Sequence, residues 1–198
     1  VYSPIVVNKP VTIIGESIDN TIIDGQGTET AIQITANNVC IRGFRVRNGN
    51  IGISISDSKH NVIISNMLTS NDCGISLTNS SQITMTSNMI EDNNCGIALD
   101  SSYGNTINRN TASNNNYGVD LRYSQNNAIT WNVFATNAHT GLYLYNSTQN
   151  IVASNSLKSN GQNGIYLQHC FSNILYHNNI INNTVQVYQF DSSNTWSY

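Results

Sequence analysis

The hydrophobic positions of this chain follow a repeat of 22 or 23 residues. Six glycines mark the repeat: Gly52, Gly74, Gly96, Gly118, Gly141 and Gly164. The residues one and three positions after each glycine are apolar, and this alternation predicts a strand with one buried face. Two further apolar columns recur later in each repeat, at Ile63, Met85, Ile107, Ile129, Val152 and Leu175, and at Leu68, Ile90, Ala112, Phe134, Leu157 and Ile180. Each repeat therefore predicts three short strands.

Asparagine occupies fixed positions between these strands. It stands fourteen residues after every glycine, at Asn66, Asn88, Asn110, Asn132, Asn155 and Asn178, and nineteen after, at Asn71, Asn93, Asn115, Asn137, Asn160 and Asn183. Nine residues after the glycine it appears in five of six repeats, with Ile83 as the exception. Asn and Gly both tolerate left-handed backbone, so we expect tight turns at these places. Stacked amides can also form hydrogen-bonded ladders.

Three strands and three turns per repeat predict an all-β fold, a right-handed, single-stranded parallel β-helix of about eight turns. At ~4.8 Å per turn the rod is on the order of 40 Å long. We expect one β-helix domain over 1–198, with an N-terminal turn or cap region over 1–30 and regular coils over 31–190. Val11–Ile14 and Thr21–Ile23 predict two strands in the N-terminal region. The chain begins within the pattern at Val1, and we interpret it as a fragment of a longer protein.

Charge and hydrophobicity exclude several classes of function. Eight Lys and Arg against eleven Asp and Glu give a net charge of −3, without the basic surface of a nucleic-acid binder. Hydrophobic residues make up 39% of the chain, too many for an acidic disordered segment. The longest apolar runs last only a few residues, so we expect no membrane-spanning helix.

The N-terminal motifs resemble a known family. The segments Val6-Val7-Asn8-Lys9-Pro10-Val11-Thr12-Ile13-Ile14-Gly15-Glu16 and Asn20-Thr21-Ile22-Ile23-Asp24-Gly25, followed by Asn/Gly coils, are similar to NosD-like right-handed β-helix proteins. Similar repeats occur in archaeal cell-surface proteins. The resemblance implies an extracellular, cell-surface or periplasmic location. It implies little about activity, since this scaffold carries lyases, hydrolases, epimerases, adhesive stalks and a copper-maturation factor.

The cysteines and histidines do not predict a metal centre. Cys73 and Cys95 precede successive coil glycines, so they share a column and could form a disulfide or remain stacked thiols. Cys40 and Cys170 lie about six turns apart. The four histidines fall on different turns, at His60, His139, His169 and His177, and Met67 with Met89 forms one further column pair. We predict no metal ligands and no cofactor.

One outward face changes character along the rod. The residues two and four positions after each glycine point outward, and in the early turns they are Ser or Thr. In the later turns the candidate carbohydrate-contacting residues appear: Asp100, Asp120, Arg122, Tyr143, Tyr145, Tyr166, His169 and Tyr188. Tyrosine rings suit sugars because they combine apolar area with a hydrogen-bonding hydroxyl. The alternative is that the tyrosines simply favour strands and stack on one another.

Asp100 and Asp120 are weak catalytic candidates. One turn and two residues separate them, roughly 8 Å between Cα atoms, which lies within the carboxyl separation of inverting glycosidases. Arg122 shares the column of Asp100, and we expect it to lower the pKa of both carboxylates, whereas a general acid needs a raised pKa. Tyr117-Gly118-Val119-Asp120 is similar to the Tyr-Gly-Phe-Asp-Pro-His motif of alginate epimerases, but Leu121-Arg122 replaces Pro-His.

These features favour a non-catalytic extracellular or cell-surface module with a structural or carbohydrate-contacting role. The alternatives are a polysaccharide-active lyase, hydrolase or epimerase, and a NosD-like periplasmic copper-handling protein. The partners we expect are polysaccharides or cell-envelope components, and not nucleic acid. The oligomeric state stays open, because the terminal turns present sheet edges that could pair.

Overall fold

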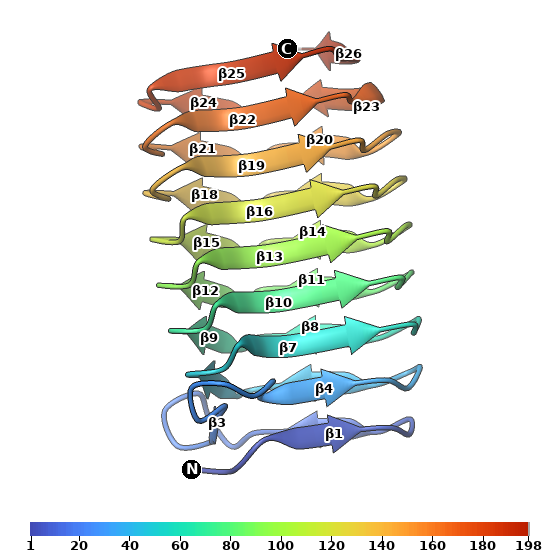
Figure 1. The fold of residues 1–198 in the computed structure, drawn as a ribbon, viewed down its shortest axis with the longest axis vertical. Helices are drawn as coiled ribbons and strands as arrows, with labels where there is room; N and C mark the ends of the chain where they lie inside the picture. The colour runs from blue at the N-terminus through green and yellow to red at the C-terminus, as the bar shows by residue number, and fades with distance from the viewer. Residues whose placement is uncertain (198) are drawn as a thin grey trace.

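The computed structural model describes residues 1–197 and shows a parallel β-helix built from 26 strands. Three parallel sheets run the length of the rod (Figure 1). The front strands of Figure 1 run from left to right while the chain climbs, which is right-handed winding. Eight turns contain all three strands and a ninth contains two, so the predicted fold and turn number are confirmed.

The first sheet contains β1 (Ile5–Val7), β4 (Ile32–Ile34), β7 (Ile51–Ser56), β10 (Cys73–Thr78), β13 (Cys95–Asp100), β16 (Tyr117–Arg122), β19 (Thr140–Tyr145), β22 (Asn163–Gln168) and β25 (Val185–Phe190).

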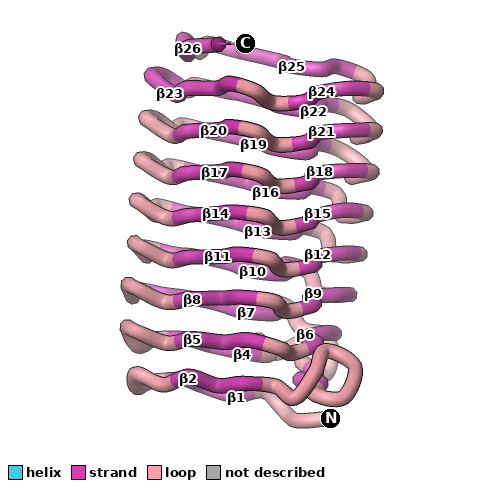
Figure 2. Tube along the Cα trace, turned by 180° about the vertical axis from the view of Figure 1, so that it is seen from behind, coloured by secondary structure: helices cyan, strands magenta, loops and turns pink. Residues whose placement is uncertain are grey.

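The other two sheets consist of three-residue strands except for β23 and β26, and they form the far side of the rod (Figure 2). The second sheet contains β2 (Thr12–Ile14), β5 (Cys40–Arg42), β8 (Val62–Ile64), β11 (Thr84–Thr86), β14 (Thr106–Asn108), β17 (Ala128–Thr130), β20 (Ile151–Ala153), β23 (Phe171–Tyr176) and β26 (Ser193–Ser197). The third sheet contains β3 (Ile22–Asp24), β6 (Arg45–Arg47), β9 (Met67–Thr69), β12 (Met89–Glu91), β15 (Thr111–Ser113), β18 (Val133–Ala135), β21 (Ser156–Lys158) and β24 (Asn179–Ile181). The two strands predicted near the N-terminus are β2 and β3, whereas the sequence did not predict β1.

Strand register repeats the sequence alignment. Ile97 on β13 lies between Ile75 on β10 and Val119 on β16, so equivalent positions of successive repeats are stacked. The aliphatic columns after each glycine, together with those of the second and third sheets, are buried and form one continuous core. The predicted alternation of inward apolar and outward residues on the first sheet therefore holds along the rod.

The asparagine ladders are present and the amides are buried. In the middle of one ladder, the backbone N–H and the side-chain Nδ2 of Asn88 both donate to Oδ1 of Asn110, at 3.0 and 3.0 Å. The Nδ2 of Asn110 in turn donates to the carbonyl oxygen of Met85 at 2.9 Å. Each ladder asparagine thus provides hydrogen-bond partners for backbone N–H and carbonyl groups of the turns, which would otherwise be buried without a partner. Ile83 interrupts one ladder, but its backbone N–H still donates to Asn105.

The left-handed residues are not the ladder asparagines themselves. Positive φ falls on the residue immediately before, as at Ser65 before Asn66 and Ser87 before Asn88. The preceding residue makes the corner and the asparagine then points its amide inward, so the expected link between ladder asparagine and left-handed backbone is wrong at these turns. The sequence analysis missed a serine column in the corner between the first and second sheets, the same corner that contains the Asn61 ladder. Its members are Ser58, Ser80, Ser102, Ser124 and Ser147, followed by Cys170 and Ser192.

The repeating glycines are required by close approach between turns. A Cβ at Gly96 would lie 2.4 Å from the carbonyl oxygen of Gly118 on the next turn. The same contact would be 2.6 Å at Gly74 and 2.5 Å at Gly118. Any side chain at these positions would push successive turns apart, which explains why glycine marks the repeat.

Candidate functional site

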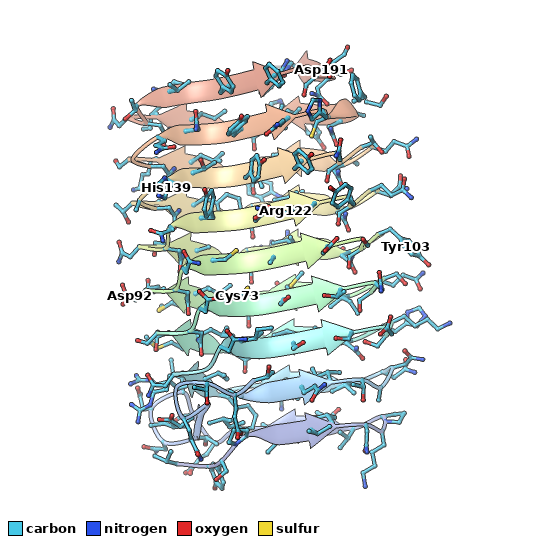
Figure 3. All side chains as sticks on the ribbon, viewed as in Figure 1. Cys73, Asp92, Tyr103, Arg122, His139 and Asp191 are labelled. Carbon is cyan, nitrogen blue, oxygen red and sulfur yellow. The ribbon has the colours of Figure 1, made fainter. Side chains whose placement is uncertain are left out.

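The outward face of the first sheet changes from short to aromatic side chains halfway along the rod. Two outward columns are in register as predicted: Ser54, Ser76, Ala98, Asp120, Tyr143, Tyr166 and Tyr188, and beside it Ser56, Thr78, Asp100, Arg122, Tyr145, Gln168 and Phe190. In Figure 3, Arg122 lies where the crowded rings of the upper turns begin. We call the outward face of β16, β19, β22 and β25 the aromatic face.

Asp120 and Arg122 form an ion pair at the lower edge of the aromatic face. The guanidinium Nη2 lies 3.0 Å from Oδ2 of Asp120, and Nε lies 3.1 and 3.2 Å from the two carboxylate oxygens. The side chain of Asp120 is only 13% exposed, whereas that of Arg122 is 53% exposed. Arg122 therefore pairs with the carboxylate on its own strand and partly covers it.

The pKa of Asp120 contradicts the sequence-based expectation. We expected Arg122 to lower the carboxylate pKa, but burial raises the pKa of Asp120 above its ordinary value, and this effect outweighs the hydrogen bond and charge of Arg122. The charge of Asp100 on the neighbouring strand adds to the increase. Arg122 itself has its pKa raised, chiefly by its hydrogen bond to Asp120. The site thus contains a carboxylate that takes up a proton more readily than an exposed aspartate.

Tyr143 lies on the next turn above Asp120 and contacts Arg122. Tyr143 is the register partner of Asp120, and the guanidinium carbon of Arg122 lies 5.8 Å from the centre of its ring. The Tyr143 hydroxyl makes a hydrogen bond with Oε1 of Gln168 at 3.0 Å. Burial raises the pKa of Tyr143 to about 12. The phenol therefore stays protonated at neutral pH and acts as a hydrogen-bond donor, not as a base.

The rings form two contiguous series. In the first, the ring centres of Tyr143 and Tyr166 are 5.0 Å apart, and those of Tyr166 and Tyr188 are also 5.0 Å apart with the planes at 88°. In the second, the ring pairs Tyr123–Tyr145, Tyr145–His169 and His169–Phe190 have centres 5.6 to 5.9 Å apart. The tyrosines contact one another across successive turns in tilted and edge-on geometry, and such ring-to-ring contact is what the alternative interpretation expects.

The sequence analysis missed several members of these series. Tyr117 reaches Tyr143 with ring centres 6.3 Å apart, and it stacks on His139 at 5.5 Å with nearly parallel planes. Tyr123 and Phe190 extend the second series. Tyr117 stands one residue before Gly118 and Tyr123 stands five after it, so both lie outside the outward columns two and four residues after each glycine.

Two of the predicted residues lie at the margins of the face. Asp100 is exposed and accepts a hydrogen bond from the Ser101 hydroxyl at 2.9 Å. It lies one turn below Arg122, and its offset from Asp120 is the predicted one turn and two residues. His169, directly after β22, pairs through Nδ1 with Oδ2 of Asp191, directly after β25, at 2.8 Å. Asp100 therefore pairs with a serine and Asp191 with a histidine, and neither carboxylate is hydrogen-bonded to a second carboxyl group among the described residues.

A shallow depression of about 430 Å³ lies at the upper end of the aromatic face. Its lining is made of β22, β25 and the turns before them: Gln162, Asn163, Tyr166, Thr184, Val185 and Tyr188. The volume falls within the ~300–1,000 Å³ range of small-molecule sites, although this depression is open to solvent. Amide, hydroxyl and aromatic groups therefore meet beside one another here.

The column cysteines face each other on adjacent turns. Cys73 on β10 and Cys95 on β13 are register partners, and both thiols are free in the structure. A hydrogen bond with Cys73 and burial raise the pKa of Cys95 well above its ordinary value. Met67 and Met89 are likewise register partners on the third sheet. Across residues 1–197, no three His, Cys, Asp or Glu side chains gather where they could hold one metal ion.

Comparison with known families identifies a match over most of the chain. A family model described as "Periplasmic copper-binding protein (NosD)" matches residues 11–198. No curated protein matches the chain. In the part of the chain that the structure describes, no helix has the length and apolar character needed to cross a membrane.

Several solved structures share the fold. The periplasmic alginate epimerase AlgG superposes with a TM-score of 0.68 at 20% identity, over 83% of this chain and 49% of that chain. The Dettilon tailspike protein superposes with a TM-score of 0.65 at 14% identity, over 98% and 53%. An alginate lyase from a Paenibacillus species gives a TM-score of 0.62 at 14% identity, over 97% and 85%. This chain spans about half the length of the epimerase.

Proposed function

This chain belongs to the NosD family, and on that premise we propose that it is an extracytoplasmic β-helix module that binds polysaccharide along its aromatic face without cleaving it. The family is described as periplasmic. We extend the proposal to a cell-surface or extracellular location because the chain has few charges and a regular, rod-like scaffold.

The aromatic face carries this proposal. Rings from four successive turns lie side by side next to amide and hydroxyl groups, an arrangement that suits the apolar faces and hydroxyls of sugars. Tyr188 is 44% exposed, so part of this apolar area is open to a ligand. Structural neighbours named as alginate epimerase and alginate lyase act on polysaccharide with the same scaffold, which supports the substrate class.

A glycan array with matched variants tests the proposal. We expect the wild-type protein to bind one or more polysaccharides and Tyr166→Ala to lose at least about 1.4 kcal/mol of that binding, a tenfold weakening. Tyr103→Ala is the control, because Tyr103 is 54% exposed but lies on a turn away from the aromatic face (Figure 3). Failure of the wild-type protein to bind any glycan, or equal losses in both variants, would overturn the proposal.

A second candidate function, polysaccharide cleavage or epimerisation, is favoured by one observation. Burial raises the pKa of Asp120, and the protonated Tyr143 lies one turn away, so the site holds two protonatable groups beside the Arg122 cation. Such a pair could move a proton at a sugar carbon or a glycosidic oxygen. Assays for unsaturated uronates and for new reducing ends test this function, and turnover that disappears in Asp120→Asn would replace the non-catalytic proposal.

Copper handling, the third interpretation, finds little support in the donor groups. Copper sites use clustered thiolate, thioether or imidazole ligands. The described residues offer only pairs, Cys73 with Cys95 and Met67 with Met89, and the Cys95 thiol is held in its protonated form. These residues do not make the ligand set that the family description implies. Elemental analysis of the purified protein after dialysis against cuprous ion provides the direct test.

A further inference from the structure

We infer that the aromatic face binds an uncharged glycan and discriminates against polyuronates. This inference rests on the proposed function and names its substrate class. It departs from the substrate named for two of the structural neighbours, alginate epimerase and alginate lyase. It follows from the distribution of charge over the first sheet and from the chemistry of the depression at its upper end.

The first sheet offers no free cation to a negatively charged ligand. Within residues 1–197, the charged side chains on its nine strands are Asp100, Asp120 and Arg122. Arg122 uses its Nε and Nη2 groups on Asp120, so its charge is already compensated. The next cation along the chain, Lys158, lies on β21 in the third sheet. A uronate chain placed on this face would meet no Lys or Arg that is free of a carboxylate partner.

The carboxylates beside the face would repel such a chain. Asp100 is exposed one turn below Arg122, and Asp191 directly follows β25 with 65% of its side chain exposed. His169 contacts Asp191 at 2.8 Å and, when protonated, would neutralise that charge rather than add a free one. The aromatic face is therefore neutral to negative, and like charges in proximity disfavour binding.

The depression itself has the groups that neutral sugars require. Gln162 and Asn163 supply amide donors and acceptors, Thr184 supplies a hydroxyl, and Tyr166 and Tyr188 supply ring faces. Its lining carries no Lys, Arg, His, Asp or Glu. A sugar hydroxyl can exchange hydrogen bonds with these amides, whereas a carboxylate would lose water without gaining a charged partner.

Calorimetric titration with oligosaccharides of equal length tests the inference. The probes are neutral hexasaccharides of glucose, mannose and galactose, and hexasaccharides of mannuronate and galacturonate, each at about 20 and 200 mM NaCl. We expect at least one neutral hexasaccharide to bind about tenfold more tightly than either uronate. Its affinity should change by less than about twofold with salt, since screened charges contribute little. Tyr188→Ala should weaken this binding, and Tyr103→Ala should leave it unchanged.

A charge-removing variant gives an independent result. Replacing Asp100 and Asp191 together by Asn should raise the affinity for the uronate hexasaccharides at low salt, and the gain should shrink at about 200 mM NaCl because the effect is electrostatic. Uronates that bind the wild-type protein as tightly as the neutral sugars would overturn this inference and leave the proposed polysaccharide binding intact. If neither class binds, both proposals fail together.

Discussion

The asparagine ladders allow a direct test of stability, because one turn has two adjacent asparagines of which one belongs to a buried ladder and the other lies at the surface. Asn93 is buried in the ladder that follows the third sheet, and Asn94 is exposed. We predict that Asn93→Ala destabilises the protein strongly and that Asn94→Ala has little effect. The two variants remove the same side-chain atoms from the same turn, so each is the natural control for the other.

The expected magnitude follows from the hydrogen bonds of Asn93. Its Oδ1 accepts from the backbone N–H and the Nδ2 of Asn71, at 2.9 and 3.1 Å. Its Nδ2 donates to the carbonyl oxygens of Leu68 and Glu91, at 3.1 and 2.8 Å, and to Oδ1 of Asn115 at 3.0 Å. Alanine leaves the buried N–H of Asn71 without an acceptor. One or two orphaned buried groups at about 1–3 kcal/mol each give an expected loss of about 1–6 kcal/mol.

Asn94 makes a different set of contacts. Its Nδ2 donates to Asp72 at 3.1 Å, and its Oδ1 accepts from Nδ2 of Asn116, with every partner at the surface where water can replace it. We therefore expect Asn94→Ala to change the free energy of unfolding by no more than about 0.5 kcal/mol. Urea unfolding followed by circular dichroism measures both values, and amide exchange at Asn71 reports the local effect.

Asn93→Asp separates hydrogen bonding from packing volume. Aspartate keeps the acceptor oxygen and the shape but loses the Nδ2 donor, and it buries a charge when ionised. We expect this variant to be at least as unstable as Asn93→Ala at neutral pH and to recover part of the loss in acid, where the carboxyl regains a donor. Equal stabilities for Asn93→Ala and Asn94→Ala would refute the assignment of ladder hydrogen bonds as a main source of stability.

Three further predictions concern the core, the ion pair and the thiols. Gly96→Ala should cost about 1–3 kcal/mol in urea unfolding, because its Cβ would lie 2.4 Å from the Gly118 carbonyl oxygen. Burial raises the pKa of Asp120, so the folded state binds the carboxyl proton more tightly than the unfolded state does. The free energy of unfolding should therefore fall as the pH rises above the ordinary pKa of 3.8. Urea unfolding at a series of pH values measures this dependence, and Asp120→Asn should make it weaker. Because the raised pKa of Cys95 keeps its thiol protonated, oxidised glutathione should accept two electrons and two protons from Cys73 and Cys95 only slowly at neutral pH and faster as the pH rises. The resulting disulfide should stabilise the protein by about 3 kcal/mol. Mass spectrometry follows the crosslink, and a crosslink that forms readily at neutral pH would contradict the raised pKa.

The fold was predictable from the sequence because every turn repeats the same physical solution. The glycine, the two aliphatic residues after it and the following asparagines recur at fixed spacing, and the register in the structure matches that alignment residue by residue. The serine column was also visible, six residues after each glycine, but it was not recognised; Cys170 occupies the same position in one turn and donates to the same kind of carbonyl group. β1 was missed because Ile5–Val7 precedes the first clear repeat.

The positions of the candidate site residues were predictable, but their electrostatics were not. Stacking of the repeats placed Asp120 beside Arg122 and below Tyr143 without any knowledge of the structure. The pKa of Asp120 depends instead on how much water reaches its carboxylate. Arg122 folds back on its own strand and pairs with Asp120, whose side chain is left 13% exposed while that of Arg122 stays 53% exposed. Side-chain conformation decides that coverage, and residue spacing does not encode it.

The change along the first sheet shows how a regular solenoid can acquire a binding surface. The backbone of β10 and β13 is in the same register as that of β19 and β22, so the scaffold is equivalent in both halves of the rod. What differs is side-chain length: Ser76 and Ala98 occupy the column that Tyr143 and Tyr166 fill higher up. Because an outward residue of a stacked turn contacts chiefly the residues directly above and below it, such replacements alter the surface without disturbing the buried core. The aromatic face is therefore a set of local side-chain replacements on a repeated scaffold. The substitutions Ser76→Tyr and Ala98→Tyr should extend the face toward the N-terminal turns and leave the fold intact.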